Sequence, residues 1–148
     1  CIAGSRLIVQ RGVEEALLDR IVARARAVRA GPTWSEQTPF GPIVSEPQLQ
    51  QIDSIVRQTI DSGAEPLIGG CCMEFENGGT FYEPTVLTKV SSAMEAVREE
   101  VFGPVLTVQS FDDEDEGYEL ASHEKYGLAA GVHTGDVNKA LRAASVAA

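Results

Sequence analysis

The chain has 148 residues, which is enough for one domain with a hydrophobic core but too few for two. Hydrophobic residues make up 43% of it and charged residues 23%, close to the average for globular proteins, which argues against a disordered or low-complexity chain. Twelve Lys and Arg against 22 Asp and Glu give a net charge of -10, so we expect no nucleic-acid partner, and no apolar run reaches the length of about 18 residues that a membrane span needs.

The first half of the chain predicts one strand and two long helices. Residues 6–10 (RLIVQ) alternate and include β-branched side chains, as a strand does. Over residues 13–28 apolar side chains recur at helical spacing between charged ones, which predicts a long amphipathic helix that stops at the Gly-Pro pair after it. Residues 33–45 are rich in proline and glycine and predict a loop. A second helix with one apolar face then begins near Pro47 and ends at Gly63.

The second half alternates shorter elements. We expect strands over residues 64–68, 85–90, 105–111 and 128–133, a turn region over 69–79, helices over 93–98 and 112–122, and a last helix that begins at Asp136. The segment 128–133 is apolar enough to be buried in a sheet. This alternation, without an internal repeat or linker, predicts a single α/β domain with a largely parallel sheet flanked by helices.

The two ends of the chain predict a piece, or a processed product, of a longer protein. The first residue is Cys1 instead of Met, and the chain ends on Ala147 and Ala148 without a turn or a cap. We therefore expect one domain over residues 1–148 that is truncated at both ends. A targeting segment ahead of Cys1 would leave no trace here.

The cysteines and histidines favour a reducing compartment and no metal site. Cys71 and Cys72 are adjacent and cannot easily bridge each other, so together with Cys1 they do not resemble the framework of a secreted disulfide protein. We expect a cytoplasmic location and interpret the adjacent pair as incidental thiols. His123 and His133 lack the spacing of zinc ligands, and we expect them to be structural or exposed.

The acidic run over residues 112–116 shares only its charge with a calcium loop, because it lacks the central glycine and distal glutamate of an EF-hand. We interpret it as a helix start, where carboxylates meet the positive end of the helix dipole. Trp34, the one tryptophan, lies in the predicted loop, and its role stays open.

Cys1 is the first candidate for chemistry. A thiol immediately ahead of a strand can be displayed at the end of a sheet, where α/β proteins place their sites. Two other interpretations stay open on the residue alone. One is a small core side chain, which is the commonest role of cysteine, and the other is the nucleophile of a hydrolase whose own terminal amine acts as base.

Five segments, spread along essentially the whole chain, carry recognisable motifs: CIAGSRLIVQ (1–10), GPIVSEPQLQQI (41–52), GGTFYEPTVLTKV (78–90), REEVFGPVLTVQSFDDEDE (98–116) and YGLAAGVHTGD (126–136). Together, in this order, they resemble the aldehyde dehydrogenase superfamily. In that superfamily the nucleophilic cysteine is followed by x-A-G-S-R and a strand, and a cofactor motif reads E-x-F-G-P. The resemblance implies the part of a catalytic domain that starts at the catalytic cysteine, with the nucleotide-binding domain absent from this chain.

The resemblance implies roles for three residues. Cys1 would attack an aldehyde carbonyl as a thiolate, the thiohemiacetal would give a hydride to NAD or NADP, and water would hydrolyse the thioester to a carboxylate. The backbone N–H of Cys1 would help to hold the oxyanion. Glu100 would accept hydrogen bonds from the nicotinamide ribose, and Phe102 would pack against the cofactor near the nicotinamide. The spacing to Phe102 and the Gly-Pro pair after it favours Glu100 over its neighbour Glu99.

Several alternatives stay open. A CoA-acylating member would pass the acyl group to CoA instead of water, and a non-enzymatic member would be a structural or binding protein. On residue type alone, Glu100 is a solvated acid and Phe102 a core side chain. In the superfamily the general base and the oxyanion side chain precede the cysteine, so this chain contains neither and does not specify the aldehyde. We expect the parent protein to be a homo-oligomer that acts on a small-molecule aldehyde, without nucleic-acid or membrane partners.

Overall fold

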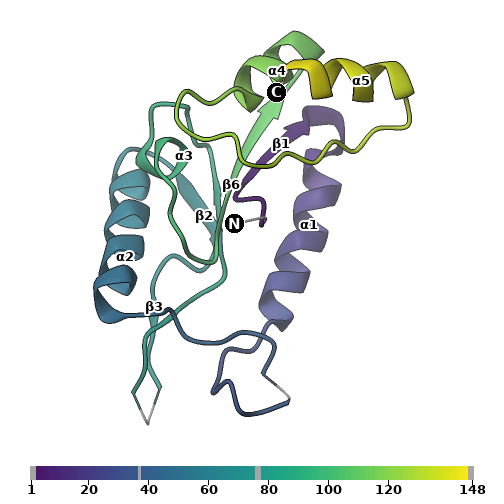
Figure 1. The fold of residues 1–148 in the computed structure, drawn as a ribbon. Coiled ribbons are helices and arrows are strands. Elements are labelled where there is room, and N and C mark those ends of the chain that lie inside the picture. Colours follow the sequence, from purple (N-terminus) through teal and green to yellow (C-terminus); the bar gives the residue numbers. More distant parts are fainter. Residues whose placement is uncertain (1–2, 37, 76–77, 147–148) are drawn as a thin grey trace.

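The computed structural model describes residues 3–36, 38–75 and 78–146 (Figure 1). Its elements are, in order, β1 (Arg6–Gln10), α1 (Arg11–Ala27), α2 (Glu46–Asp61), β2 (Glu65–Ile68), β3 (Cys72–Met73), β4 (Phe81–Tyr82), β5 (Thr85–Thr88), α3 (Glu95–Arg98), β6 (Val105–Phe111), α4 (Glu114–Ala121) and α5 (Val137–Val146). None of the described helices is long and apolar enough to cross a membrane.

A mostly parallel sheet in the order β1, β6, β5, β2 forms the centre of the molecule. β6 pairs in parallel with β1, where Arg6 lies opposite Thr107, and with β5, where Thr85 lies opposite Val105. β2 pairs antiparallel with β5 at the edge. Parallel neighbours need a crossover between them, and the segment that contains α3 supplies one between β5 and β6. The α/β class predicted from the sequence is confirmed.

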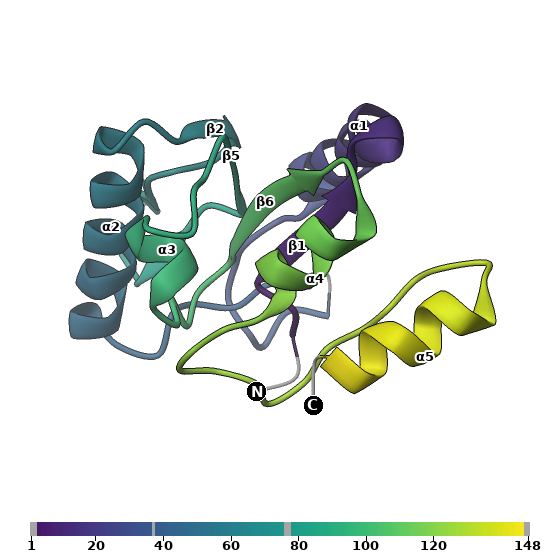
Figure 2. The ribbon, with the colours of Figure 1, turned by 90° about the horizontal axis from the view of Figure 1, so that it is seen from above.

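Helices cover both faces of this sheet (Figure 2). α1 packs on one face over a cluster around Val9, Val86 and Val108, whereas α2 packs on the other face over a larger cluster that includes Leu87 and Val105. Adjacent residues of a strand point to opposite faces, so β6 contributes to both clusters. Both β1 and β6 form at the bounds that the sequence predicts.

α2 forms where the sequence predicts a helix with one apolar face. The hydroxyl of Ser45 accepts a hydrogen bond from the N–H of Gln48 (3.4 Å), Pro47 lies in the first turn, and Gly63 follows the end with a φ of 107°. The buried residues of α2 are Leu49, Ile52, Ile55, Val56 and Thr59. This helix therefore builds most of the larger cluster.

The acidic run caps a helix, as predicted. The carboxylate of Asp113 accepts a hydrogen bond from the N–H of Glu116 (3.0 Å), and the carboxylate of Glu116 accepts one from the N–H of Asp112 (2.8 Å). This reciprocal pair is a variant of the capping box: it satisfies the N–H of Glu116 in the first turn of α4 and the N–H of Asp112 just ahead of the N-cap. In the described part of the chain, no three His, Cys, Asp or Glu side chains are grouped so that they could hold a metal ion.

α1 is less buried than an amphipathic helix of its length would be. Every residue of α1 keeps part of its surface exposed, and Val13 is 54% exposed. Leu17 and Ile21 lie partly buried against the sheet. Part of the apolar face of α1 therefore packs on the sheet, and part of it is exposed to solvent.

The predicted strand over residues 128–133 is wrong. This segment pairs with no described strand, and Leu128 and Val132 are 78% and 47% exposed. It runs as an extended connection to α5, which begins after Asp136 as predicted and is capped by its carboxylate (2.8 Å from the N–H of Asn138) (Figure 1). An apolar segment becomes a strand only where a neighbouring strand satisfies its backbone groups, and this segment is paired with none of the described strands.

The predicted turn region over residues 69–79 contains a short strand. β3 pairs antiparallel with β4, so that Cys72 lies opposite Tyr82 and Met73 opposite Phe81. Two residues are too few to show an alternating pattern, which is why the sequence did not indicate β3.

Candidate active site

The candidate site lies where the chain enters the central strand. Residues 99–104 connect α3 to β6, and the N–H of Thr107 donates to the carbonyl of Ser5 (3.0 Å). Because β1 and β6 are parallel, the segment ahead of β1 and the segment ahead of β6 lie at the same end of the sheet. Cys1 itself lies outside the described residues. The structure thus brings the start of the described chain to the end of the sheet that carries Glu100 and Phe102.

Two contacts with α2 fix this connection. Val101 is 3% exposed, and its carbonyl accepts a hydrogen bond from the side-chain amide of Gln48 in α2 (3.2 Å). Two residues later, Gly103 packs directly on Ile52 of α2. Val101 is buried in the core, whereas its neighbours Glu100 and Phe102 are exposed at the surface.

The conformation of Phe102 is unusual. Its φ is 54°, in the left-handed region that L-residues with large side chains avoid, and its side chain is 63% exposed. The expectation from residue type alone, a core phenylalanine, is therefore wrong. An exposed aromatic ring on a strained backbone is a common feature of ligand sites.

We expect Gly103→Ala to destabilise the protein by about 1 to 3 kcal/mol. A Cβ at this position would lie 2.6 Å from Cδ1 and 2.9 Å from Cγ1 of Ile52, a side chain that is fully buried and cannot move away freely. Gly12→Ala is the matched control, since a Cβ there would meet no described atom within 4 Å and alanine favours a helix. Chemical denaturation of both variants checks this, and equal stability of the two would contradict the proposed packing.

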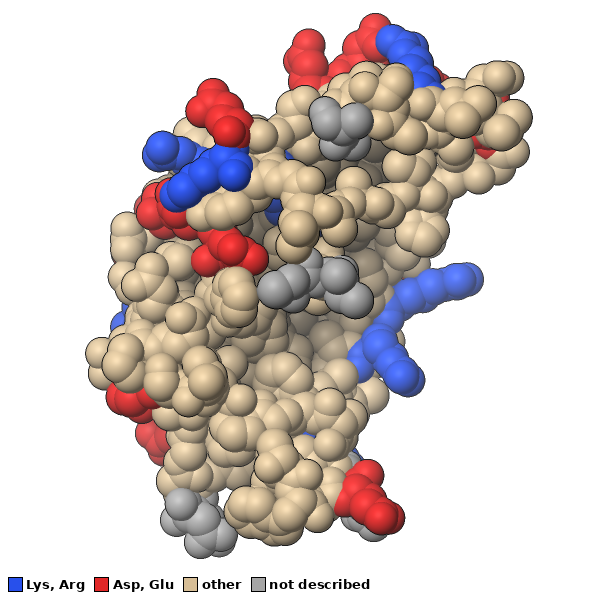
Figure 3. Space-filling model, viewed as in Figure 1, with Lys and Arg blue, Asp and Glu red and all other residues tan. Residues whose placement is uncertain are grey.

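The two neighbouring glutamates differ in their surroundings. The carboxylate of Glu99 accepts hydrogen bonds from Nζ of Lys125 (2.6 Å) and from the hydroxyl of Tyr126 (3.2 Å), and the bond from Lys125 lowers the pKa of Glu99. Charged side chains of both signs gather over α3 in the space-filling view (Figure 3). The carboxylate of Glu100 is exposed and has no hydrogen-bond or ion-pair partner among the residues that the structure describes. Of the two acids, Glu100 is therefore the free acceptor, in agreement with the motif spacing.

Three residues beside this connection were not predicted to contribute to it. His123, Lys125 and Tyr126 lie next to α3 and Glu99, although about 26 positions separate them in the sequence. The sequence predicts that the two histidines are structural or exposed. His123 is structural, and His133 is exposed. Contacts across such a separation leave no periodic signal.

Cys71 and Cys72 lie apart from this connection, at the β3–β4 hairpin. Both are exposed, and the thiol of Cys71 donates to the carboxylate of Glu83 (3.2 Å). This hydrogen bond raises the pKa of Cys71, and burial raises the pKa of Cys72. A raised thiol pKa means less thiolate at neutral pH, which makes both poor nucleophiles.

We expect Glu83→Ala to speed the alkylation of Cys71 by iodoacetamide near pH 8. The substitution removes the carboxylate that favours the neutral thiol, so the pKa of Cys71 falls and more thiolate is present at the same pH. Well above both pKa values the two rates should converge. Rates measured across pH in a variant without the other cysteines check this, and an unchanged profile would show that the contact with Glu83 does not control the thiol.

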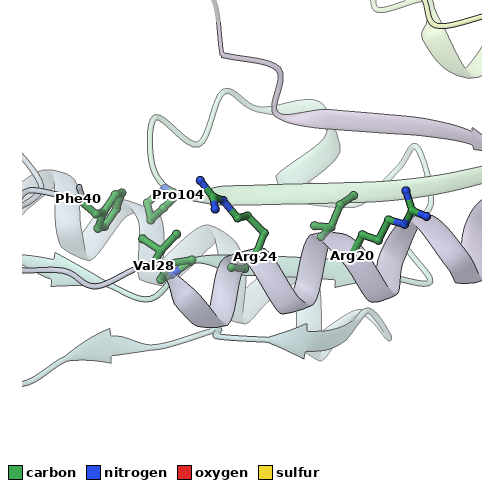
Figure 4. A pocket seen from close by; sticks show the side chains of 8 residues that line it. Arg20, Arg24, Val28, Phe40 and Pro104 are labelled. Atoms are coloured by element: carbon green, nitrogen blue, oxygen red, sulfur yellow. The ribbon is translucent and has the colours of Figure 1, made fainter. Parts of the chain in front are cut away.

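An open hollow of about 470 Å³ lies on the α1 side of the same connection (Figure 4). Its lining residues are Arg20, Ile21, Arg24, Ala25, Val28, Phe40, Pro84 and Pro104. Pro104 is the only member of the connection that reaches it, and Glu100 and Phe102 are not among the lining residues. The hollow is therefore separate from the candidate site.

Comparisons with known proteins point to one family. A sequence profile of the aldehyde dehydrogenase family matches residues 1–147. An aldehyde dehydrogenase of Aspergillus niger is 40% identical over 145 residues, which are 96% of this chain and 28% of that protein. A betaine aldehyde dehydrogenase of Bacillus subtilis is 39% identical over 147 residues, 98% of this chain and 30% of that protein.

Solved structures agree. The betaine aldehyde dehydrogenase of Staphylococcus aureus in complex with NAD⁺ superposes with a TM-score of 0.93 at 35% identity, over 99% of this chain and 29% of that one. An NAD-dependent aldehyde dehydrogenase of Sinorhizobium meliloti gives a TM-score of 0.93 at 38% identity, with the same coverage. The chain thus spans less than a third of the length of these relatives.

Proposed function

The chain belongs to the aldehyde dehydrogenase family, and on that premise we propose that it carries the nucleophile and part of the cofactor contact of an enzyme that oxidises an aldehyde to a carboxylate with NAD. In this proposal Cys1 is the nucleophile, Glu100 holds the nicotinamide ribose and Phe102 packs beside the ring. The solved structures of two relatives above, named as NAD⁺-bound or NAD-dependent, support NAD as the cofactor. The nucleotide-binding domain and the general base would belong to the rest of the parent protein.

One observation carries the proposal: the carboxylate of Glu100 is unpaired among the described residues, yet fixed residues hold its backbone on both sides. Val101 is anchored to α2 on one side, and the carboxylate of Glu99 is bound on the other. A carboxyl group can accept hydrogen bonds from a pair of ribose hydroxyls, and the exposed ring of Phe102 offers a face to a planar nicotinamide. The residues present therefore fit the cofactor.

The chemistry assigned to the chain's own residues follows from this placement. The thiolate of Cys1 attacks the carbonyl carbon and forms the C–S bond of a thiohemiacetal, while its backbone N–H stabilises the oxygen that becomes negative. When bound, the nicotinamide supplies the hydride acceptor. Cys1 is left as a thioester, and attack by water releases the carboxylate and restores the thiolate. Glu100 and Phe102 act by orienting the nicotinamide. Correct placement of the two reacting groups lowers a large part of the barrier to hydride transfer, because the hydride moves only between groups in contact.

The experiment that tests the ribose role is Glu100→Gln in the full-length parent. We expect weaker NAD binding and slower hydride transfer, together equivalent to about 1 to 3 kcal/mol, because a neutral amide accepts a weaker hydrogen bond than a carboxylate. Calorimetry with NAD and single-turnover formation of NADH measure the two effects. Glu65→Gln, which changes an exposed carboxylate on the edge strand β2, is the control.

Unchanged binding and unchanged hydride transfer in Glu100→Gln would remove the ribose role from this residue. The same assays separate the alternatives for the whole protein. Release of acyl-CoA instead of free acid would identify a CoA-acylating enzyme, and NAD binding without any reduction on addition of aldehydes would identify a non-enzymatic member. We also propose that the parent is a cytoplasmic homo-oligomer, which fractionation and light scattering test.

A further inference from the structure

A short segment after α4 folds back onto the end of α3. Nδ1 of His123 accepts hydrogen bonds from the N–H groups of Lys125 and Tyr126, each 3.1 Å long. The ring proton must therefore be on Nε2, which donates to the carbonyl of Val97 in α3 (3.0 Å). The imidazole thus closes a tight turn over residues 123–126 and fastens that turn to α3.

The same turn aims two side chains at one carboxylate. Nζ of Lys125 lies 2.6 Å from Oε2 of Glu99, and the hydroxyl of Tyr126 lies 3.2 Å from the same oxygen. Lys125 also lies 5.3 Å from the centre of the Tyr126 ring, and that ring packs on His123 with centroids 5.1 Å apart. One oxygen of Glu99 is therefore held by two donors whose positions depend on each other.

The bonds from Lys125 and Tyr126 to Glu99 form a clamp, and this clamp lies one residue from the unpaired carboxylate of Glu100. Val97 and Glu99 are held by the turn, Val101 is held by Gln48, and Glu100 is the residue between the two holds. α3 has a single turn, too short to be stable by itself, so its geometry depends on such tertiary contacts. Release of Glu99 would leave the direction of the next carboxylate unfixed.

A role in overall stability does not explain the clamp. The side chains of Lys125 and Glu99 are 56% and 35% exposed, and exposed ion pairs contribute little to the free energy of unfolding. A fixed direction at Glu100 matters far more for a transfer between two bound groups.

We propose that Lys125 and Tyr126, placed by His123, are positioning residues that hold Glu99 so that Glu100 presents its carboxylate to the nicotinamide ribose. This inference rests on the ribose role proposed for Glu100. In this proposal His123, Lys125 and Tyr126 contact neither substrate nor cofactor, and they act through the backbone of residues 99–101.

The test uses the full-length parent with Lys125→Met and Tyr126→Phe, which remove one donor each. We expect hydride transfer in single turnover to fall about tenfold in the double variant, since misplacement by about 1 Å can cost about a hundredfold. The KM for aldehyde and the melting temperature should not change. Lys125→Arg, which keeps a cation within reach of Glu99, should restore most of the rate.

Lys89→Met is the matched control. Lys89 and Glu65 form a surface pair of nearly the same length (2.7 Å) at β2 and β5, so its loss reports what an exposed pair of this type does by itself. We expect a rate equal to that of the parent. A rate loss as large as that of Lys125→Met would overturn the inference, because the effect would then not depend on Glu99.

A double-mutant cycle separates this inference from the proposed function. In the Glu100→Gln background, Lys125→Met should cause no further loss, because the carboxylate that it positions is gone. If Glu100→Gln slows the transfer while Lys125→Met does not, the inference is wrong and the ribose role stands. If Glu100→Gln has no effect, the ribose role fails and the inference fails with it.

Discussion

Replacement of Cys1 by alanine in the full-length parent should abolish turnover, with a fall of about a thousandfold or more, while the melting temperature changes little. The proposed reaction forms its covalent bond at this thiol, and neither of the other two cysteines can replace it. Cys71 and Cys72 lie at a separate hairpin, and their raised pKa values leave little thiolate. Steady-state formation of NADH from an aldehyde measures the effect.

Cys71→Ala and Cys72→Ala are the matched controls, since each removes a thiol from an exposed position away from the connection ahead of β6. Both should keep turnover close to that of the parent. Trapping of the acyl-enzyme should label the parent and both control variants but not the Cys1 variant. Normal turnover by Cys1→Ala would refute the assignment of the nucleophile.

The 148-residue chain by itself should neither reduce NAD or NADP nor bind them tightly. It spans less than a third of its relatives, and of the proposed catalytic arrangement it holds only Cys1, Glu100 and Phe102. Hydride transfer needs the aldehyde adduct and the nicotinamide in contact, and three residues cannot hold both. Calorimetry measures the binding of NAD and NADP, and an aldehyde-dependent absorbance assay measures their reduction.

The same chain should self-associate. Leu128, Val137 and Leu141 are 78%, 68% and 65% exposed, so the extended segment and α5 carry apolar surface that the described residues do not cover. α5 is attached to α4 mainly by surface ion pairs, of Lys139 with Glu114 and of Arg142 with Asp115. Light scattering checks the association. Robust turnover by a monomer would show that the assignment of the catalytic residues is wrong.

The sequence by itself determined the elements whose periodicity comes from local geometry. Residues 6–10 and 105–111 alternate because side chains of a strand alternate between two faces, and both strands form at those bounds. The capping box of α4 follows from residues within one turn of each other. The motif spacing singled out Glu100, whose role in the site stays a prediction.

Only the tertiary structure decided the features that depend on distant partners. Residues 128–133 have the composition of a strand, but backbone hydrogen bonds must come from a neighbour, and these residues pair with none of the described strands. On residue type alone Phe102 would be a core residue, yet its side chain is exposed, while Val101 before it is buried and Gly103 after it packs on Ile52. The different surroundings of Glu99 and Glu100 arise because His123 fastens a turn about 26 residues away to α3, and the donors of that turn bind the carboxylate of Glu99.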